Sequence, residues 1–97
     1  MASNTSDLNR CIRNDFVCIQ SEINIKSRRF RIPLDDKSQD LLDAYYKQVS
    51  SDIPNNDRDV SAIRDLKRSI TASNDGDSFS GEVSLLLKFI MSKLPKS

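Results

Sequence analysis

Apolar side chains recur every three or four residues in several stretches of this chain, which is the period of an amphipathic α-helix. A first helix can begin with Ser6 or Asp7 as its N-cap. Its apolar positions, which Cys11 extends, are Leu8, Ile12, Phe16, Ile19 and Ile23. A second helix is predicted over about 36–51, after Pro33 and with an acidic first turn. Its apolar face is Leu41, Leu42, Tyr45, Val49 and Ile53.

Two more helices are predicted in the second half of the chain. The third follows Asn56 or Asp57 as its N-cap, and its apolar face is Val60, Ile63, Leu66 and Ile70. Residues 73–78 are dense in turn formers and predict a loop. The last helix is predicted over about 79–94, and its apolar side chains cover roughly 240° of its circumference. Because a surface helix needs a much narrower apolar face, this helix is either central to the bundle or covered by a second molecule.

The period changes between the first two helices, around residues 22–32. Here apolar residues alternate with polar ones, and the pairs are Ile23 with Ile25 and Phe30 with Ile32. Alternation is typical of a β-strand, although the two pairs have different parity and need a hairpin turn or a bulge between them. We therefore predict a mainly α, four-helix bundle-like domain with a short β or extended segment around residues 22–32.

The length of 97 residues suits one domain, so we expect residues 1–97 to form a single domain in which residues 1–6 are flexible. Apolar residues make up 37% of the chain and charged residues 30%, which is typical of a small folded domain. No apolar run approaches the roughly 20 residues of a membrane-spanning helix, and the N-terminus does not resemble a signal peptide. We expect an intracellular, cytoplasmic protein.

The residues that usually carry chemistry are scarce. Histidine is absent, and Cys11 and Cys18 would lie about 10 Å apart on one helix, too far for a disulfide. We expect both thiols to be reduced and packed in the core. The acidic set matches no calcium-binding loop, and it consists of Asp35, Asp36, Asp40 and Asp43. We therefore expect no catalytic residues, no metal, no cofactor and no small-molecule substrate.

Positive charge is concentrated between the first two helices. The basic segment contains Lys26, Arg28, Arg29, Phe30 and Arg31. Such cations can contact phosphates, and the aromatic ring can stack on a base. Residues 1–34 carry a net +3, residues 35–59 a net −4 and residues 60–97 a net +2, for a total of +1. The basic segment therefore either pairs internally with the acidic second helix, organises head-to-tail contact between molecules, or binds nucleic acid.

Residues 28–70 resemble the ribbon-helix-helix family of dimeric DNA-binding proteins. The resemblance is carried by Phe30-Arg31-Ile32-Pro33-Leu34, the second helix, and Ser61-Ala62-Ile63-Arg64-Asp65-Leu66. The turn between these helices lacks the glycine usual in the family, and a helix precedes the expected strand. The resemblance implies that one strand from each chain pairs in a dimer, with Arg29 and Arg31 facing the DNA groove.

The wide apolar face of the last helix and the scarcity of catalytic residue types favour a non-enzymatic interaction module. Such a module self-associates or binds a protein partner. A homodimer would use one margin of the last helix, while the other margin faces the chain's own core. The candidate interface residues are Leu85 and Phe89 at one margin and Leu87 and Met91 at the other. The alternative is a small nucleic-acid-binding protein, a regulator or a suppressor, that uses the basic segment. The composition is rich in Ile, Asn, Asp, Lys and Ser, which is typical of AT-rich genomes, including those that encode small viral accessory proteins.

Overall fold

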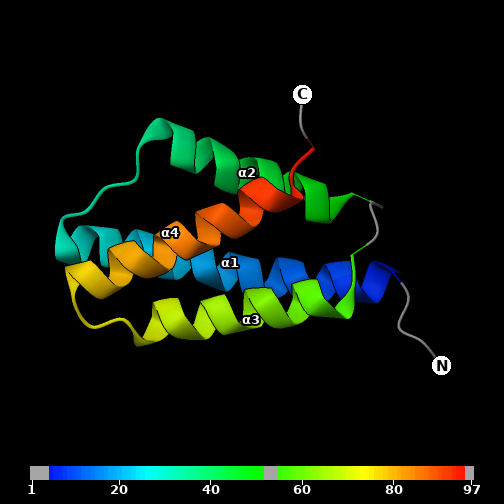
Figure 1. The fold of residues 1–97 in the computed structure, drawn as a ribbon, viewed down its shortest axis with the longest axis horizontal. Helices are drawn as coiled ribbons and strands as arrows, with labels where there is room; N and C mark the ends of the chain where they lie inside the picture. Colours follow the sequence, from blue (N-terminus) through cyan, green and yellow to red (C-terminus); the bar gives the residue numbers. More distant parts are fainter. Residues whose placement is uncertain (1–4, 52–54, 96–97) are drawn as a thin grey trace.

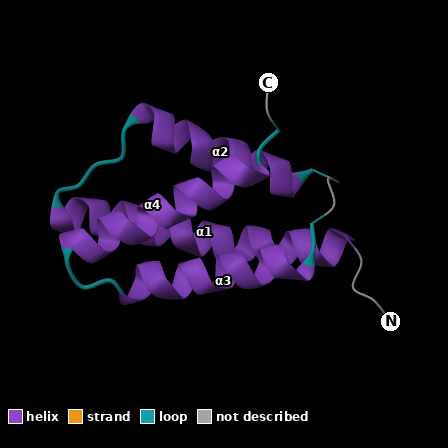
Figure 2. Ribbon diagram, in the orientation of Figure 1, coloured by secondary structure: helices purple, strands orange, loops and turns teal. Residues whose placement is uncertain are grey.

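A computed structural model of the chain describes residues 5–51 and 55–95, and within them every regular element is a helix (Figure 2). The helices are α1 (Thr5–Phe30), α2 (Asp36–Ser50), α3 (Asp57–Ala72) and α4 (Gly76–Lys93). The prediction of a four-helix, bundle-like fold is confirmed. Of the segment predicted to be flexible, residues 1–4 lie outside the described residues, whereas Thr5 and Ser6 belong to α1.

The four helices form a flat bundle with extents of 43 × 30 × 17 Å. Successive helices alternate in direction, so that α1 and α3 run one way while α2 and α4 run the other (Figure 1). The helix α1 packs along α3 and α2, and α4 packs on those same two helices from the other side. Since α4 passes in front of α1 in Figure 1 and the two touch only lightly, their outer surfaces form the two broad faces of the molecule.

Short polar residues begin three of the helices. The side chains of Asp35, Asn56 and Asp75 each accept a hydrogen bond from the backbone N–H three residues later, over 2.8, 3.0 and 2.7 Å. The cap at Asp35 holds the pKa of that carboxyl below its usual value, mainly through the hydrogen bonds from Ser38. Because Asp75 acts as a cap, α4 begins at Gly76, three residues before the predicted start, and the preceding loop is correspondingly shorter.

The core is built from the inward faces of all four helices. Each predicted apolar stripe supplies part of it, although Ile53 lies outside the described residues. The buried apolar residues are Ile12, Phe16, Ile19, Ile23, Leu42, Tyr45, Val49, Ile63, Ile70, Phe79, Val83, Leu86 and Ile90. Leu8, Leu41, Val60 and Leu66 are half-buried. The helix α4 buries only one face, so it forms one side of the bundle and is not its centre.

The β segment predicted around residues 22–32 is wrong, because α1 continues as a helix through Phe30. Lys26 occupies the next inward position after Ile23 and is buried, whereas Ile25 is exposed. The helix ends in a Schellman motif, in which the Ile32 N–H donates to the Ser27 carbonyl over 2.9 Å. No ribbon strand is therefore present between residues 28 and 34, and the structure does not support the resemblance to ribbon-helix-helix proteins.

The prediction that Cys11 and Cys18 pack in the core is also wrong. Both are free thiols, as expected, but both side chains are exposed. Each cysteine precedes a buried isoleucine, Ile12 or Ile19, by one residue. Since one residue turns a helix by about 100°, this places the thiols on the outer face of α1.

Candidate interaction surfaces

The outer face of α4 carries large apolar side chains that the bundle does not cover. Leu85 is 51% exposed and Met91 is 56% exposed, whereas Leu87 and Phe89 are half-buried. The exposed Lys88 lies between these two residues, and one turn before Leu85 a Cβ added at Gly81 would meet no atom within 4 Å. The four residues predicted for an interface therefore flank an open helix face.

The margin of α4 that carries Phe89 is fixed to the bundle. The rings of Phe89 and Tyr45 meet edge to face, with centroids 6.0 Å apart. The ammonium of Lys93 lies 5.6 Å from the centroid of Phe89 and 2.8 Å from a carboxylate oxygen of the buried Asp59. The Gln48 side chain also donates to the Lys93 carbonyl over 3.0 Å. These contacts hold the end of α4 against α2 and α3.

The opposite margin of α4, which carries Leu87 and Met91, borders a groove of about 250 Å³ that both apolar and polar side chains line. The groove lies between α4, the connection from α1 to α2, and the first turn of α2. Its apolar lining consists of Ile32, Pro33, Leu34, Phe79, Val83 and Leu87. Leu87 therefore belongs both to the groove and to the predicted interface, so this margin offers a recess beside an exposed side chain.

Lys26, which we predicted as a nucleic-acid contact, is buried and forms hydrogen bonds within the bundle. Its ammonium donates to the carbonyls of Ile70, Thr71 and Ser73 over 2.6, 2.5 and 2.8 Å. These carbonyls belong to the end of α3 and the residue that follows it, a region that carries partial negative charge. Since α3 has no basic residue in its own last turn, Lys26 supplies that cation from α1.

Of the other residues in the basic segment, Phe30 packs against the core and the three arginines lie on the surface. The ring of Phe30 packs on that of Phe79, with centroids 5.8 Å apart, so it is not free to stack on a base. Arg28, Arg29 and Arg31 are exposed. Arg31 also has a φ of 57°, the left-handed conformation that ends α1.

The predicted pairing of these arginines with the acidic helix is absent from the described part of the chain. The ion pairs found there join Asp7 to Arg10, Asp15 to Arg64 and Lys67, and Asp59 to Lys93. None involves the basic segment, and none involves the acidic residues of α2.

The helix α1 also carries an exposed apolar surface that the sequence pattern did not predict. Val17 is 50% exposed and Ile25 is 53% exposed, and both lie on the outer face with the two cysteines. The only signal in the sequence is that both positions fall off the buried stripe of α1. The helix α1, which carries this surface, and α4 lie on opposite sides of the bundle (Figure 1).

Tyr45 is a buried titratable residue in the core of the bundle. Burial raises the pKa of the Tyr45 hydroxyl above its usual value, and the nearby Asp59 carboxylate adds to the shift. Within the described ranges of the chain, that hydroxyl has no hydrogen-bond partner. Among the described residues, no group of three or more potential ligands is placed to hold a metal ion, and no helix is long and apolar enough to cross a membrane.

No protein-family model, curated protein or solved structure matches this chain.

Proposed function

We propose that the chain is a non-enzymatic interaction module that pairs with a second copy of itself through the outer face of α4. The observation that carries this proposal is the exposure of Leu85 and Met91 on α4, together with the groove that Leu87 lines beside the margin of Met91. In a two-fold dimer the same patch occurs on both subunits, so an exposed side chain of one copy faces the groove of the other.

The expected dimer is weak. Fully burying a leucine or methionine side chain contributes about 1.5–3 kcal/mol, and a two-fold interface would bury two of each. Association costs about 4–15 kcal/mol in lost freedom of motion, which offsets much of this gain. The dimer should therefore form at high protein concentration and dissociate on dilution. We place this module in the cytoplasm, because its exposed free thiols suit a reducing compartment.

Sedimentation velocity across a concentration series tests the proposal. The wild-type protein should pass from monomer to dimer, whereas Leu85→Glu and Met91→Glu should remain folded monomers, because a buried charge opposes pairing. Val17→Glu is the matched control, since Val17 is equally exposed but lies on the opposite face; this variant should still form dimers. A wild-type protein that stays monomeric at several hundred micromolar contradicts the proposal, as does a Val17→Glu variant that is equally monomeric.

A second candidate function is nucleic-acid binding, and the unpaired, exposed arginines at positions 28, 29 and 31 favour it. It would rest on phosphate contacts alone, because Lys26 and Phe30 are committed to the bundle. Such binding would weaken steeply with added salt. Retention of the wild-type protein on heparin at low salt distinguishes this function from pairing through α4.

A further inference from the structure

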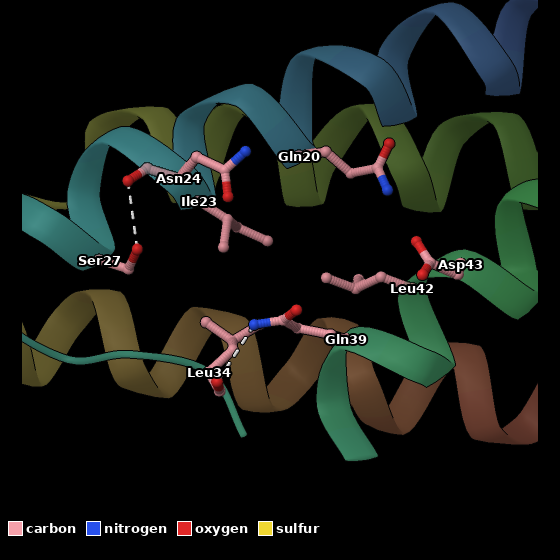
Figure 3. Close-up of a pocket in the computed structure, with 8 residues that line it drawn as sticks. All are labelled: Gln20, Ile23, Asn24, Ser27, Leu34, Gln39, Leu42 and Asp43. Carbon is pink, nitrogen blue, oxygen red and sulfur yellow. Dashed lines mark hydrogen bonds between the residues drawn. The ribbon is translucent and has the colours of Figure 1, made fainter. Parts of the chain in front are cut away.

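A cleft of about 170 Å³ lies between α1 and α2, on a different part of the molecule from the groove beside α4 (Figure 3). Its floor is apolar and consists of Ile23, Leu34 and Leu42. Its rim is polar and receives residues from both helices, namely Gln20, Asn24, Ser27, Gln39 and Asp43. In Figure 3 the side chains of Ile23 and Leu42 point into the space between the helices, and those of Gln20 and Asp43 face each other above it.

Internal hydrogen bonds occupy only part of this rim. The Ser27 hydroxyl donates to the Asn24 carbonyl over 3.1 Å, and the Gln39 side chain donates to the Leu34 carbonyl over 3.3 Å. Across the described ranges, the Asp43 carboxylate and the side-chain amide of Gln20 have no hydrogen-bond or ion-pair partner. The Asp43 carboxylate oxygens can therefore accept a hydrogen bond at one end of the cleft, where the amide nitrogen of Gln20 faces them (Figure 3).

The charge of the cleft favours a cation. Asp43 is the only charged residue in its lining. The neighbouring acidic residues Asp35, Asp36 and Asp40 are exposed on and just before α2, and they too lack ion-pair partners among the residues described. Even with Lys37 and Lys47, the two lysines of α2, this helix and the residue before it carry a net negative charge, which favours a cation at the cleft.

We infer that this cleft binds an ammonium or guanidinium group on a hydrocarbon stem, as presented by a lysine or arginine side chain. The stem packs on Ile23, Leu34 and Leu42, which an unsubstituted metal ion or a simple salt cation could not cover. The cation meets the Asp43 carboxylate. The volume is roughly ten times what one water molecule requires, so an aliphatic chain of several carbons can enter.

Nuclear magnetic resonance titration of the ¹⁵N-labelled full chain tests this inference. The probes are n-butylammonium, N-acetyl-lysine methylamide and, as a neutral control of similar shape, n-butanol. Both cations should shift the backbone amide signals of Ile23 and Leu42 in a saturable way, and n-butanol should bind more weakly. Tighter binding of the acetyl-lysine compound would identify a side-chain docking site, and tighter binding of butylammonium a site for free amines; both outcomes support the inferred chemistry.

Two variants separate the cleft from general attraction to an acidic surface. Asp43→Asn keeps the shape of the side chain but removes its charge, and it should weaken binding by about threefold to tenfold. Asp65→Asn removes an exposed charge on α3, outside the cleft, and should leave the affinity unchanged. The inference is overturned if neither cation saturates, if n-butanol binds as well as butylammonium, or if the two variants behave alike.

Discussion

Tyr45 shows how a single buried hydroxyl affects this bundle. Its ring fills the core between Phe16, at a centroid distance of 5.2 Å, and Phe89, but its hydroxyl lacks a hydrogen-bond partner. A buried polar group without a partner is destabilising by about 1–3 kcal/mol. The ring therefore stabilises the core while the hydroxyl opposes it.

We predict that Tyr45→Phe raises the free energy of unfolding by about 1 kcal/mol at neutral pH. Because the pKa of Tyr45 is raised in the folded state, the unfolded chain releases this proton first as the pH passes the ordinary value of 10.0. Titration of Tyr45 therefore leaves the free energy of unfolding unchanged below that pH and lowers it as the pH rises above it. Urea unfolding followed over pH should show a smaller alkaline loss in Tyr45→Phe than in the wild type.

The control for this prediction is Tyr46→Phe, since Tyr46 is the adjacent residue and is exposed. Its free energy of unfolding should change by less than about 0.5 kcal/mol. A Tyr45→Phe variant that is less stable than the wild type at neutral pH would show that the hydroxyl does have a partner.

At the scale of the helices, the end of α3 depends on a residue of α1. The Lys26 ammonium binds three carbonyls there, and the Ser73 hydroxyl donates to one of them, that of Ile70, over 2.6 Å. Removal of Lys26 would leave these acceptors without their charged donor.

We predict that Lys26→Met lowers the free energy of unfolding by about 2–3 kcal/mol, because methionine can fill the space but cannot donate hydrogen bonds. Amide hydrogen exchange should also accelerate in the last turn of α3 more than in α2. Arg29→Met, three residues away and exposed, serves as the control and should change stability by less than about 0.5 kcal/mol. Equal stabilities for the two variants would contradict a capping role for Lys26.

Lys26 also explains why the sequence predicted most of the helices but not the length of α1. The buried positions of α2 and α4 are apolar, and in α3 the buried polar residue Asp59 lies in the first turn, before the apolar positions that reveal the helical period. In α1 the inward position after Ile23 is a lysine, and the apolar Ile25 beside it faces outward. The buried lysine is stable only because α3 ends next to it, which is a tertiary contact between residues 44 to 47 positions apart. The spacing of apolar residues within a single helix cannot predict such a tertiary contact.

Of the two candidate sites, one could be predicted from the sequence and the other depends on tertiary packing. The exposed Leu85 and Met91 follow from the wide apolar sweep of α4, which the sequence displays. The cleft at Asp43 depends on how α1 and α2 meet around Leu34, and single-helix patterns cannot predict that arrangement.

At the scale of the whole molecule, the two broad faces should act independently. The cysteines lie on the outer face of α1, opposite the proposed α4 interface. We predict that both thiols react with a thiol reagent such as dithionitrobenzoate in the folded protein, without denaturant. The rates should be the same at concentrations where the chain is monomeric and where it is dimeric.

Cys11→Ser and Cys18→Ser should each leave one reactive thiol per chain, which assigns the two rates. If the thiols become protected as the protein concentration rises, the interface lies on α1 and not on α4. If they react only after unfolding, the outward placement of both cysteines is wrong.

The hydrogen bonds between Lys26 and the end of α3 also affect the order in which the helices fold during synthesis. The partners of Lys26, from Ile70 to Ser73, are synthesised 44 to 47 residues after it. At about 5–20 residues per second, a ribosome needs roughly 2–9 seconds to add that length of chain. During this interval the second half of α1 carries a hydrophilic residue on its inward face with no acceptor in place. We therefore expect the newly made α1 and α2 to remain incompletely folded until the end of α3 has been synthesised.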